Sequence, residues 1–199
     1  MITCLSKYVS RFLCNKHIIN SDEIDIYQYG FEIIISTVAG MIISLVVGVI
    51  FQLFYISLVY YTIFVVVRQF TGGYHAKTYL ECNIVFSIVS FSTIGLTKLI
   101  LKLSIYRIDI HFILLCFASF VIMHFAPIDH PNKRLNDEKK QINKRRSIFL
   151  TIILLVFSCF LYPIAIDVSI VIALTLCSIA TLMIIANKKQ GGEINEETD

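Results

Sequence analysis

Long apolar runs alternate with short polar segments along this chain. From Phe31 to Val67 the only charged residue is Glu32. A helix needs about 20 apolar residues to cross a membrane, so this run is long enough for two helices joined by a tight turn. We place the turn near residues 48–52 and predict membrane-spanning helices at 31–50 and 53–67.

Four further apolar runs predict spans at 83–101, 110–127, 147–166 and 168–186. The chain is 57% hydrophobic and only 16% charged, whereas about a quarter of the residues in soluble domains are charged. We therefore predict an all-α polytopic membrane protein with about six transmembrane helices. Residues 1–199 would form one domain, with a transmembrane bundle at 31–186 and a polar, disordered tail at 187–199.

The first 30 residues differ from the rest, because their pattern is amphipathic. Apolar and basic residues in this region lie on opposite sides of a helix, namely Leu5, Tyr8, Val9, Phe12 and Leu13 against Lys7, Arg11 and Lys16. Such a helix suits the membrane interface. Packing of the same helix against the bundle remains an equal alternative.

Charge placement predicts the orientation of the chain in the membrane. Six spans put both termini, the polar stretch 68–82 and the charged loop 129–146 on one side. That side holds every Lys and Arg except Lys98, Lys102 and Arg107. The side rich in positive charge is normally cytoplasmic. We therefore expect a cell-membrane protein whose termini and 68–82 stretch face the cytosol, where thiols stay reduced.

The stretch 68–82 holds the candidate chemistry. It brings together Arg68, the pair Gly72-Gly73, His75 and Cys82. A histidine near a cysteine can take the thiol proton and make a nucleophile. Seven residues of unbroken helix would separate the two by roughly 10 Å, so the pair requires a break, and the glycines supply that freedom. An inert cysteine with a structural histidine is the alternative, and Arg68 fits a topology anchor or a ligand for a carboxylate.

Several other functions lack their motifs. The six cysteines form no CxxC pair, and no GxxxxGK phosphate loop is present. His124, Asp129 and His130 lie among prolines, which indicates a turn that ends a span rather than a metal site. We expect no metal, no cofactor and no nucleic-acid partner; the expected partners are the lipid bilayer and a second copy in a homodimer.

At these residues the chain resembles a known family. Arg68, the run Gly72-Gly73-Tyr74-His75-Ala76 and Cys82 are similar to the signature of accessory gene regulator B (AgrB) proteins, which are membrane cysteine endopeptidases of Gram-positive quorum sensing. The segment from Ala126 to Lys133 and the basic run after it also resemble that family.

The resemblance implies a substrate and roles for the residues. His75 would be the base and Cys82 the nucleophile, with Arg68, Gly72 and Gly73 in support. The substrate would be an AgrD-like precursor peptide with an acidic C-terminal tail. Cleavage would leave the signal part of the peptide on Cys82 as a thioester, from which it cyclises.

The sequence is consistent with three alternative interpretations. The basic loop is either a topology anchor or a dock for the acidic tail of the peptide, through Lys133, Arg134, Lys139 and Lys140. A small transporter or exporter subunit would explain the spans without proteolysis. A non-catalytic scaffold would use His75 and Cys82 as structural residues only.

Overall fold

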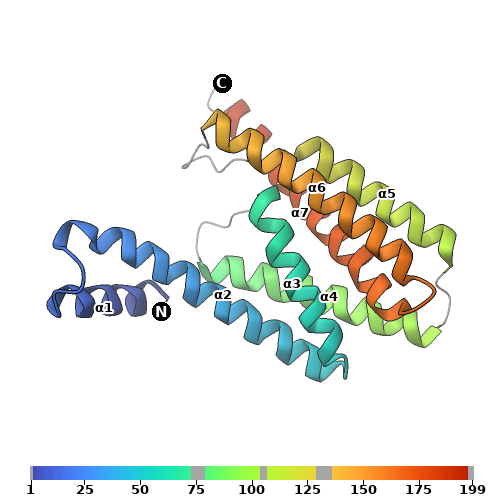
Figure 1. Cartoon of the computed structure of the whole chain (residues 1–199), viewed down its shortest axis with the longest axis horizontal. Coiled ribbons are helices and arrows are strands. Elements are labelled where there is room, and N and C mark those ends of the chain that lie inside the picture. Colours follow the sequence, from blue (N-terminus) through green and yellow to red (C-terminus); the bar gives the residue numbers. More distant parts are fainter. Residues whose placement is uncertain (1, 73–78, 104–106, 129–135, 197–199) are drawn as a thin grey trace. The chain divides into compact units, whose positions relative to one another are not determined.

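The computed structural model describes residues 2–72, 79–103, 107–128 and 136–196. The described residues form helices joined by short turns and contain no β-strand. Its elements in order are α1 (Ile2–Asn15), a short 3-10 helix η1 (Ser21–Glu23), α2 (Ile24–Ile50), α3 (Phe54–Thr71), α4 (Tyr79–Leu103), α5 (Ile108–Phe125), α6 (Asp137–Leu161) and α7 (Ile166–Glu196), as Figure 1 shows. The all-α prediction is therefore confirmed.

Local chemistry explains where several helices end. The turn between α2 and α3 lies at residues 51–53, with Gln52 at a positive φ of 57°, close to the predicted place. Gly72 ends α3 at φ 69°, a conformation that favours glycine. Asn136 caps α6, since its side chain accepts a hydrogen bond from the backbone N–H of Asp137.

Among the described residues, five helices are long and apolar enough to cross a membrane: α2 together with η1, α3, α4, α5 and α7. The remaining predicted span, 147–166, lies largely in α6, which is apolar only from Ser147 onwards because residues 137–146 are largely charged. The outward face of its apolar part carries Phe149, Val156 and Phe160, all exposed. The prediction of six spans was therefore approximate: α6 has a face suited to lipid but a short apolar length.

Two compact units make up the chain, residues 1–43 with 76–87 and residues 44–75 with 88–199. In the first unit α1 packs through small polar residues. Ser6 and Ser10 are buried, and the Ser6 hydroxyl donates to Glu32 Oε1 at 3.3 Å. The apolar stripe of α1, by contrast, is exposed at Leu5, Tyr8 and Phe12. The helix α1 therefore packs on α2 and still presents an exposed apolar face. Its place at a membrane interface stays a prediction.

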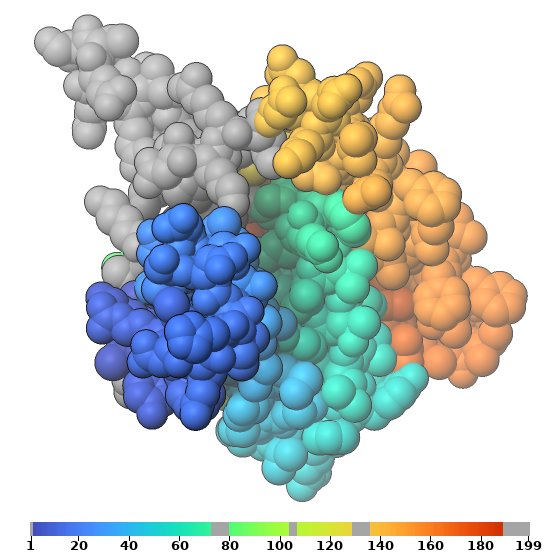
Figure 2. Space-filling view, turned by 60° about the vertical axis from the view of Figure 1, so that its left-hand side comes forward, coloured from blue at the N-terminus to red at the C-terminus, as the bar shows by residue number. Residues whose placement is uncertain are grey.

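In the second unit α7 is the central helix. In the most apolar 18-residue stretch of α7, 72% of the residues are buried. The corresponding share in the other four candidate spans is 22–39%. It contacts α3, α5 and α6. Figure 2 shows α3 and α6 at the surface, with little of α7 visible between them. The core of this unit therefore forms around α7.

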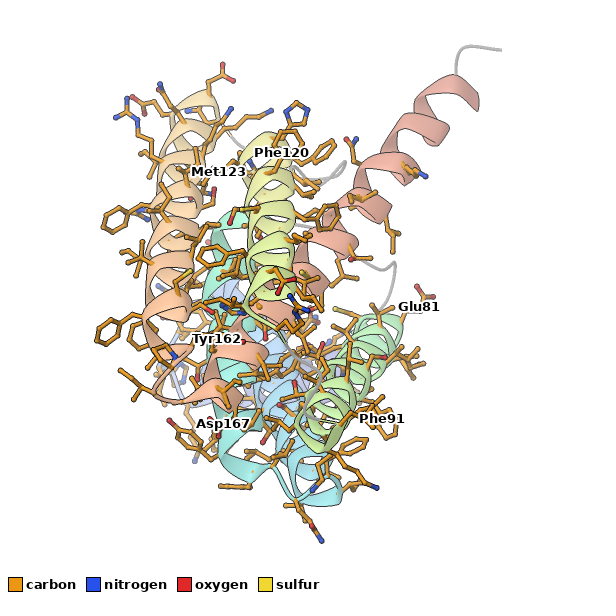
Figure 3. The ribbon with its side chains drawn as sticks, turned by 90° about the vertical axis from the view of Figure 1, so that its right-hand side faces the viewer. Glu81, Phe91, Phe120, Met123, Tyr162 and Asp167 are labelled. Atoms are coloured by element: carbon orange, nitrogen blue, oxygen red, sulfur yellow. The ribbon has the colours of Figure 1, made fainter. Side chains whose placement is uncertain are left out.

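Contacts at the two ends of the second unit give the directions of its helices. At one end His111 of α5 lies against Ser158 of α6 and Ser169 of α7; Figure 3 labels Tyr162 and Asp167 nearby, where α6 leads into α7. At the other end Gly72 pairs with Ile128. The helices α3, α5 and α7 therefore end on the same side, and α6 begins there.

The C-terminal boundary differs from the prediction. Residues 187–199 were expected to be a disordered tail, but α7 continues to Glu196. Extending an existing helix adds a hydrogen bond for each residue that becomes ordered, whereas starting a new one is costly. Lys and Gln, which occupy residues 188–190, are also good helix formers. The polar composition of the tail therefore did not end the helix.

Candidate functional site

The last turn of α3 carries the first candidate residue. Arg68 is half-buried, and its guanidinium lies 5.4 Å from the centroid of the Phe64 ring one turn earlier. A cation over an aromatic face is a favourable contact. The contact orients Arg68 along its own helix, but it does not decide between the roles of topology anchor and substrate ligand. Gly73 and His75 lie outside the described residues.

Cys82 lies in the first turn of α4, which begins at Tyr79. Its thiol is free and half-buried. Figure 3 labels its neighbour Glu81 in the same turn. The first turn of a helix has backbone N–H groups without partners in the helix, and these interact favourably with negative charge. The position therefore suits a group that becomes an anion.

The predicted break between His75 and Cys82 stays a prediction, because His75 lies outside the described residues. Within them, α3 ends at Thr71 and α4 begins at Tyr79. Arg68 and Gly72 belong to the second unit and Cys82 to the first. Each half of the candidate site is therefore described within its own unit.

Gly72 contacts a segment far away in the sequence. The N–H of Ile128 donates to the Thr71 carbonyl at 3.0 Å, and residues 72 and 128 form an isolated parallel bridge. Ala126 and Ile128 are buried. The two segments that resemble the AgrB family, 68–82 and 126–133, therefore meet at this junction through their described parts.

The basic residues lie at the start of α6. Lys139 and Lys140 are exposed there, while Lys133 and Arg134 lie outside the described residues. The Arg146 guanidinium lies 5.6 Å from the centroid of the Phe70 ring of α3. The part of α6 around Arg146 thus lies beside the last turn of α3, within one unit.

A buried polar cluster went unnoticed in the sequence. His111 is fully buried, with Nε2 at 3.3 Å from Ser158 Oγ and 3.2 Å from Ser169 Oγ. The serine hydroxyls also bond reciprocally to the backbone carbonyls of Ser169 and Ser158. The only signal in the sequence is a histidine inside an apolar run. No three His, Cys, Asp or Glu in the described part of the chain lie close enough together to hold a metal ion.

Comparisons with known proteins agree with the motif. The profile of the family Accessory gene regulator B matches residues 6–185. An AgrB-like protein of Clostridium perfringens (strain SM101 / Type A) is 27% identical over 148 residues, which cover 71% of this chain and 67% of that protein. The accessory gene regulator protein B of Staphylococcus haemolyticus (strain JCSC1435) is 27% identical over 157 residues, 79% of this chain and 81% of that protein.

No solved structure matches the chain. The family match covers most of its length and includes both segments that meet at Gly72 and Ile128. The resemblance read from the sequence is therefore confirmed. This chain belongs to the accessory gene regulator B family, which takes part in accessory gene regulator quorum sensing.

Proposed function

We propose that this protein is a membrane cysteine endopeptidase that removes the C-terminal tail of an AgrD-like precursor peptide. The observation that carries the proposal is the position of Cys82. It is a free thiol in the first turn of α4, seven residues after His75 and on a different helix from the end of α3. Family membership and the membrane-spanning helices support the same function.

The proposed reaction needs only these two side chains. His75 takes the thiol proton, and the Cys82 sulfur attacks the carbonyl carbon at the junction of signal and tail. The C–N bond breaks, and the tail leaves as an amine that receives the proton from His75. The signal remains on Cys82 as a thioester. A thiol or hydroxyl of the peptide then displaces Cys82 and closes a ring, and because the thioester is already activated, ring closure needs no ATP.

The proposed orientation places this chemistry in the cytosol, at the cell membrane. The ends of α3 and α5 and the basic start of α6 lie at one end of the second unit. Positive charge marks the cytoplasmic side. An orientation with this end inside also keeps the Cys82 thiol in a reducing compartment.

The basic start of α6 is proposed as a dock for the acidic tail of the peptide. Lys139 and Lys140 are exposed, and Arg146, about two turns further along α6, lies beside Phe70 of α3. Lys133 and Arg134 precede them in the same charged loop. Opposite charges attract over about a Debye length, so the tail would be drawn to the end of the unit that carries Arg68. The same charges also serve as the topology anchor.

The test is co-expression with an AgrD-like precursor peptide, followed by mass spectrometry. Cys82→Ala should abolish cleavage and the thioester adduct on the protein. His75→Ala should slow cleavage by about 10²–10⁴-fold. Cys116→Ala is the matched control, since it removes an exposed thiol from α5, and it should cleave normally. Normal cleavage by Cys82→Ala would exclude the proposal.

A further inference from the structure

The outward face of α6 carries one row of exposed side chains. Its members recur every three or four residues along the helix, and they are Ile142, Arg146, Phe149, Ile153, Val156 and Phe160. The opposite face holds Ser147, Thr151 and Ser158, which are fully buried. A spacing of this kind gathers residues on one side of a helix. The start of α6, which Figure 2 shows at the surface, therefore continues the outward face of its apolar part.

This helix runs beside helices that are long enough to cross a membrane. The Arg146 guanidinium contacts Phe70 in the last turn of α3, and the Ser158 hydroxyl donates to the Ser169 carbonyl in the first turn of α7. The part of α6 between these contacts therefore lies alongside two candidate spans within one unit. The outer surface of such a bundle meets lipid, so Phe149, which is 67% exposed, is suited to contact acyl chains.

Two arginines lie on this face where the apolar part of α6 begins. Arg145 and Arg146 are exposed, with Ile142 about one turn before them and Phe149 about one turn after them. Within the described part of the chain, neither arginine forms an ion pair with an acidic side chain. The acidic residue on the same face is Glu138, about two turns before Arg145. Two positive charges therefore stand side by side between apolar residues.

The contact with Phe70 leaves Arg146 able to bind an anion. The guanidinium lies over the ring, 5.6 Å from its centroid. The N–H donors of a guanidinium point outward in its plane, so stacking on an aromatic face keeps them available to a ligand. Stacking also restricts the side chain before the ligand arrives, which lowers the entropy cost of binding.

We propose that Arg145 and Arg146 bind the phosphate group of an anionic phospholipid. The planar donors of each guanidinium match phosphate oxygens, and a lipid with net negative charge balances the two arginines. Phe149 lies against the acyl chains of the same lipid, and Ile142 keeps the face apolar beyond the arginines. Lipid binding here does not depend on the proposed peptidase activity, since Cys82 belongs to the other unit.

The test uses the absence of tryptophan from the sequence. Phe149→Trp places a single fluorescent reporter about one turn from Arg146, and Phe160→Trp places a matched reporter on the same face near the other end of α6. The intact chain is reconstituted in bilayers of phosphatidylcholine and phosphatidylglycerol, with bromine on the acyl chains of one lipid or the other. Bromine quenches tryptophan only at short range, so the ratio of quenching gives the lipid preference at each position.

We expect brominated phosphatidylglycerol to be preferred at position 149 and not at position 160. A basic residue near an anionic surface contributes about fivefold in affinity. In the Phe149→Trp background, Arg145→Ala and Arg146→Ala should therefore each lower the preference about fivefold, and the double substitution should abolish it. Lys144→Ala is the matched control, because it removes the same charge from the opposite face of α6, and it should leave the preference unchanged.

Several outcomes would overturn the proposed lipid site. One is equal quenching by the two brominated lipids at position 149. Another is a preference of equal size at position 160, which would reflect a general enrichment of anionic lipid around the protein. These two comparisons use no arginine variant, so they do not depend on how such variants fold. A preference that survives the double substitution removes both arginines from the site. Equal quenching together with a change in fluorescence on adding an acidic peptide assigns this face to the peptide instead.

Discussion

Replacing Gly48 by alanine should force α2 and α3 apart. Gly48 is buried at the end of α2 and faces Ser57 in the first turn of α3. A Cβ at residue 48 would overlap the Ser57 hydroxyl and lie 2.5 Å from the Ser57 Cβ. Carbon atoms in contact normally stay about 3.5–4.0 Å apart, so the helices would have to separate locally by about 1 Å.

The structure gives the size of the effect. Overpacking of this kind costs about 1–3 kcal/mol. The same separation stretches the bond from the Ser44 hydroxyl to the Ser57 carbonyl, now 3.1 Å, beyond hydrogen-bonding range. Such bonds between membrane helices contribute about 0.6 kcal/mol. The higher helix propensity of alanine offsets up to about 1 kcal/mol of this destabilisation. We expect a net destabilisation of about 1–3 kcal/mol.

A double-mutant cycle tests the assigned cause. Ser57→Gly removes both clashing atoms, and the third-nearest atom, the Leu53 carbonyl oxygen, lies at 3.3 Å, so this substitution should rescue Gly48→Ala. Ser57→Ala retains the Cβ and should not. The measurement is reversible unfolding of the purified protein in mixed micelles, with Gly30→Ala as the control for a glycine in open space. The reasoning is refuted if Gly48→Ala is as stable as wild type, or if Ser57→Ala rescues it equally well.

Three further predictions concern charge and buried polar groups. Reversing Lys139 and Lys140 to Glu should raise the KM for an acidic-tailed peptide several-fold, with kcat unchanged and the effect lost at high salt; an unchanged KM argues against the dock. His111→Leu removes the group that joins two buried serines and should cost about 1–2 kcal/mol in unfolding experiments. Ser119→Ala should leave the free energy of unfolding unchanged or raise it, since among the described residues its buried hydroxyl has no hydrogen-bond partner. A greater loss of stability for Ser119→Ala than for His111→Leu contradicts this assignment.

The sequence predicted the helices well because the lengths of apolar runs report directly on membrane spans. It did not predict which face of a helix packs against protein. In α1 the buried residues are Ser6 and Ser10, and in α6 they include Ser147, Thr151 and Ser158. Lipid is as apolar as a protein core, so helices in a membrane associate through small and hydroxyl-bearing residues. The rule that apolar residues are buried, which holds in water, gives the wrong face here.

The candidate site, like the fold, could be predicted only in part. The motif predicted His75 and Cys82 as the site, and their spacing predicted a break between them. Both stay predictions, because His75 lies outside the described residues. The contact of Gly72 with Ile128 could not be predicted, because it joins backbone atoms of segments 56 residues apart in the sequence. A backbone contact leaves no pattern of side chains to read. Only the glycine itself, at a position where φ must be positive, pointed to a special conformation.

The short apolar part of α6 has a consequence for the membrane around the protein. Residues 147–161 rise roughly 22 Å, whereas the hydrocarbon core of a bilayer is about 30 Å thick. Such a hydrophobic mismatch is relieved by thinning of the bilayer and by basic side chains that reach the headgroups. Arg145 and Arg146 immediately precede this segment. We therefore expect the bilayer beside α6 to be thinner where Arg146 meets Phe70. A peptide lying on the membrane surface would then need to sink less deeply into the bilayer to reach the end of α3.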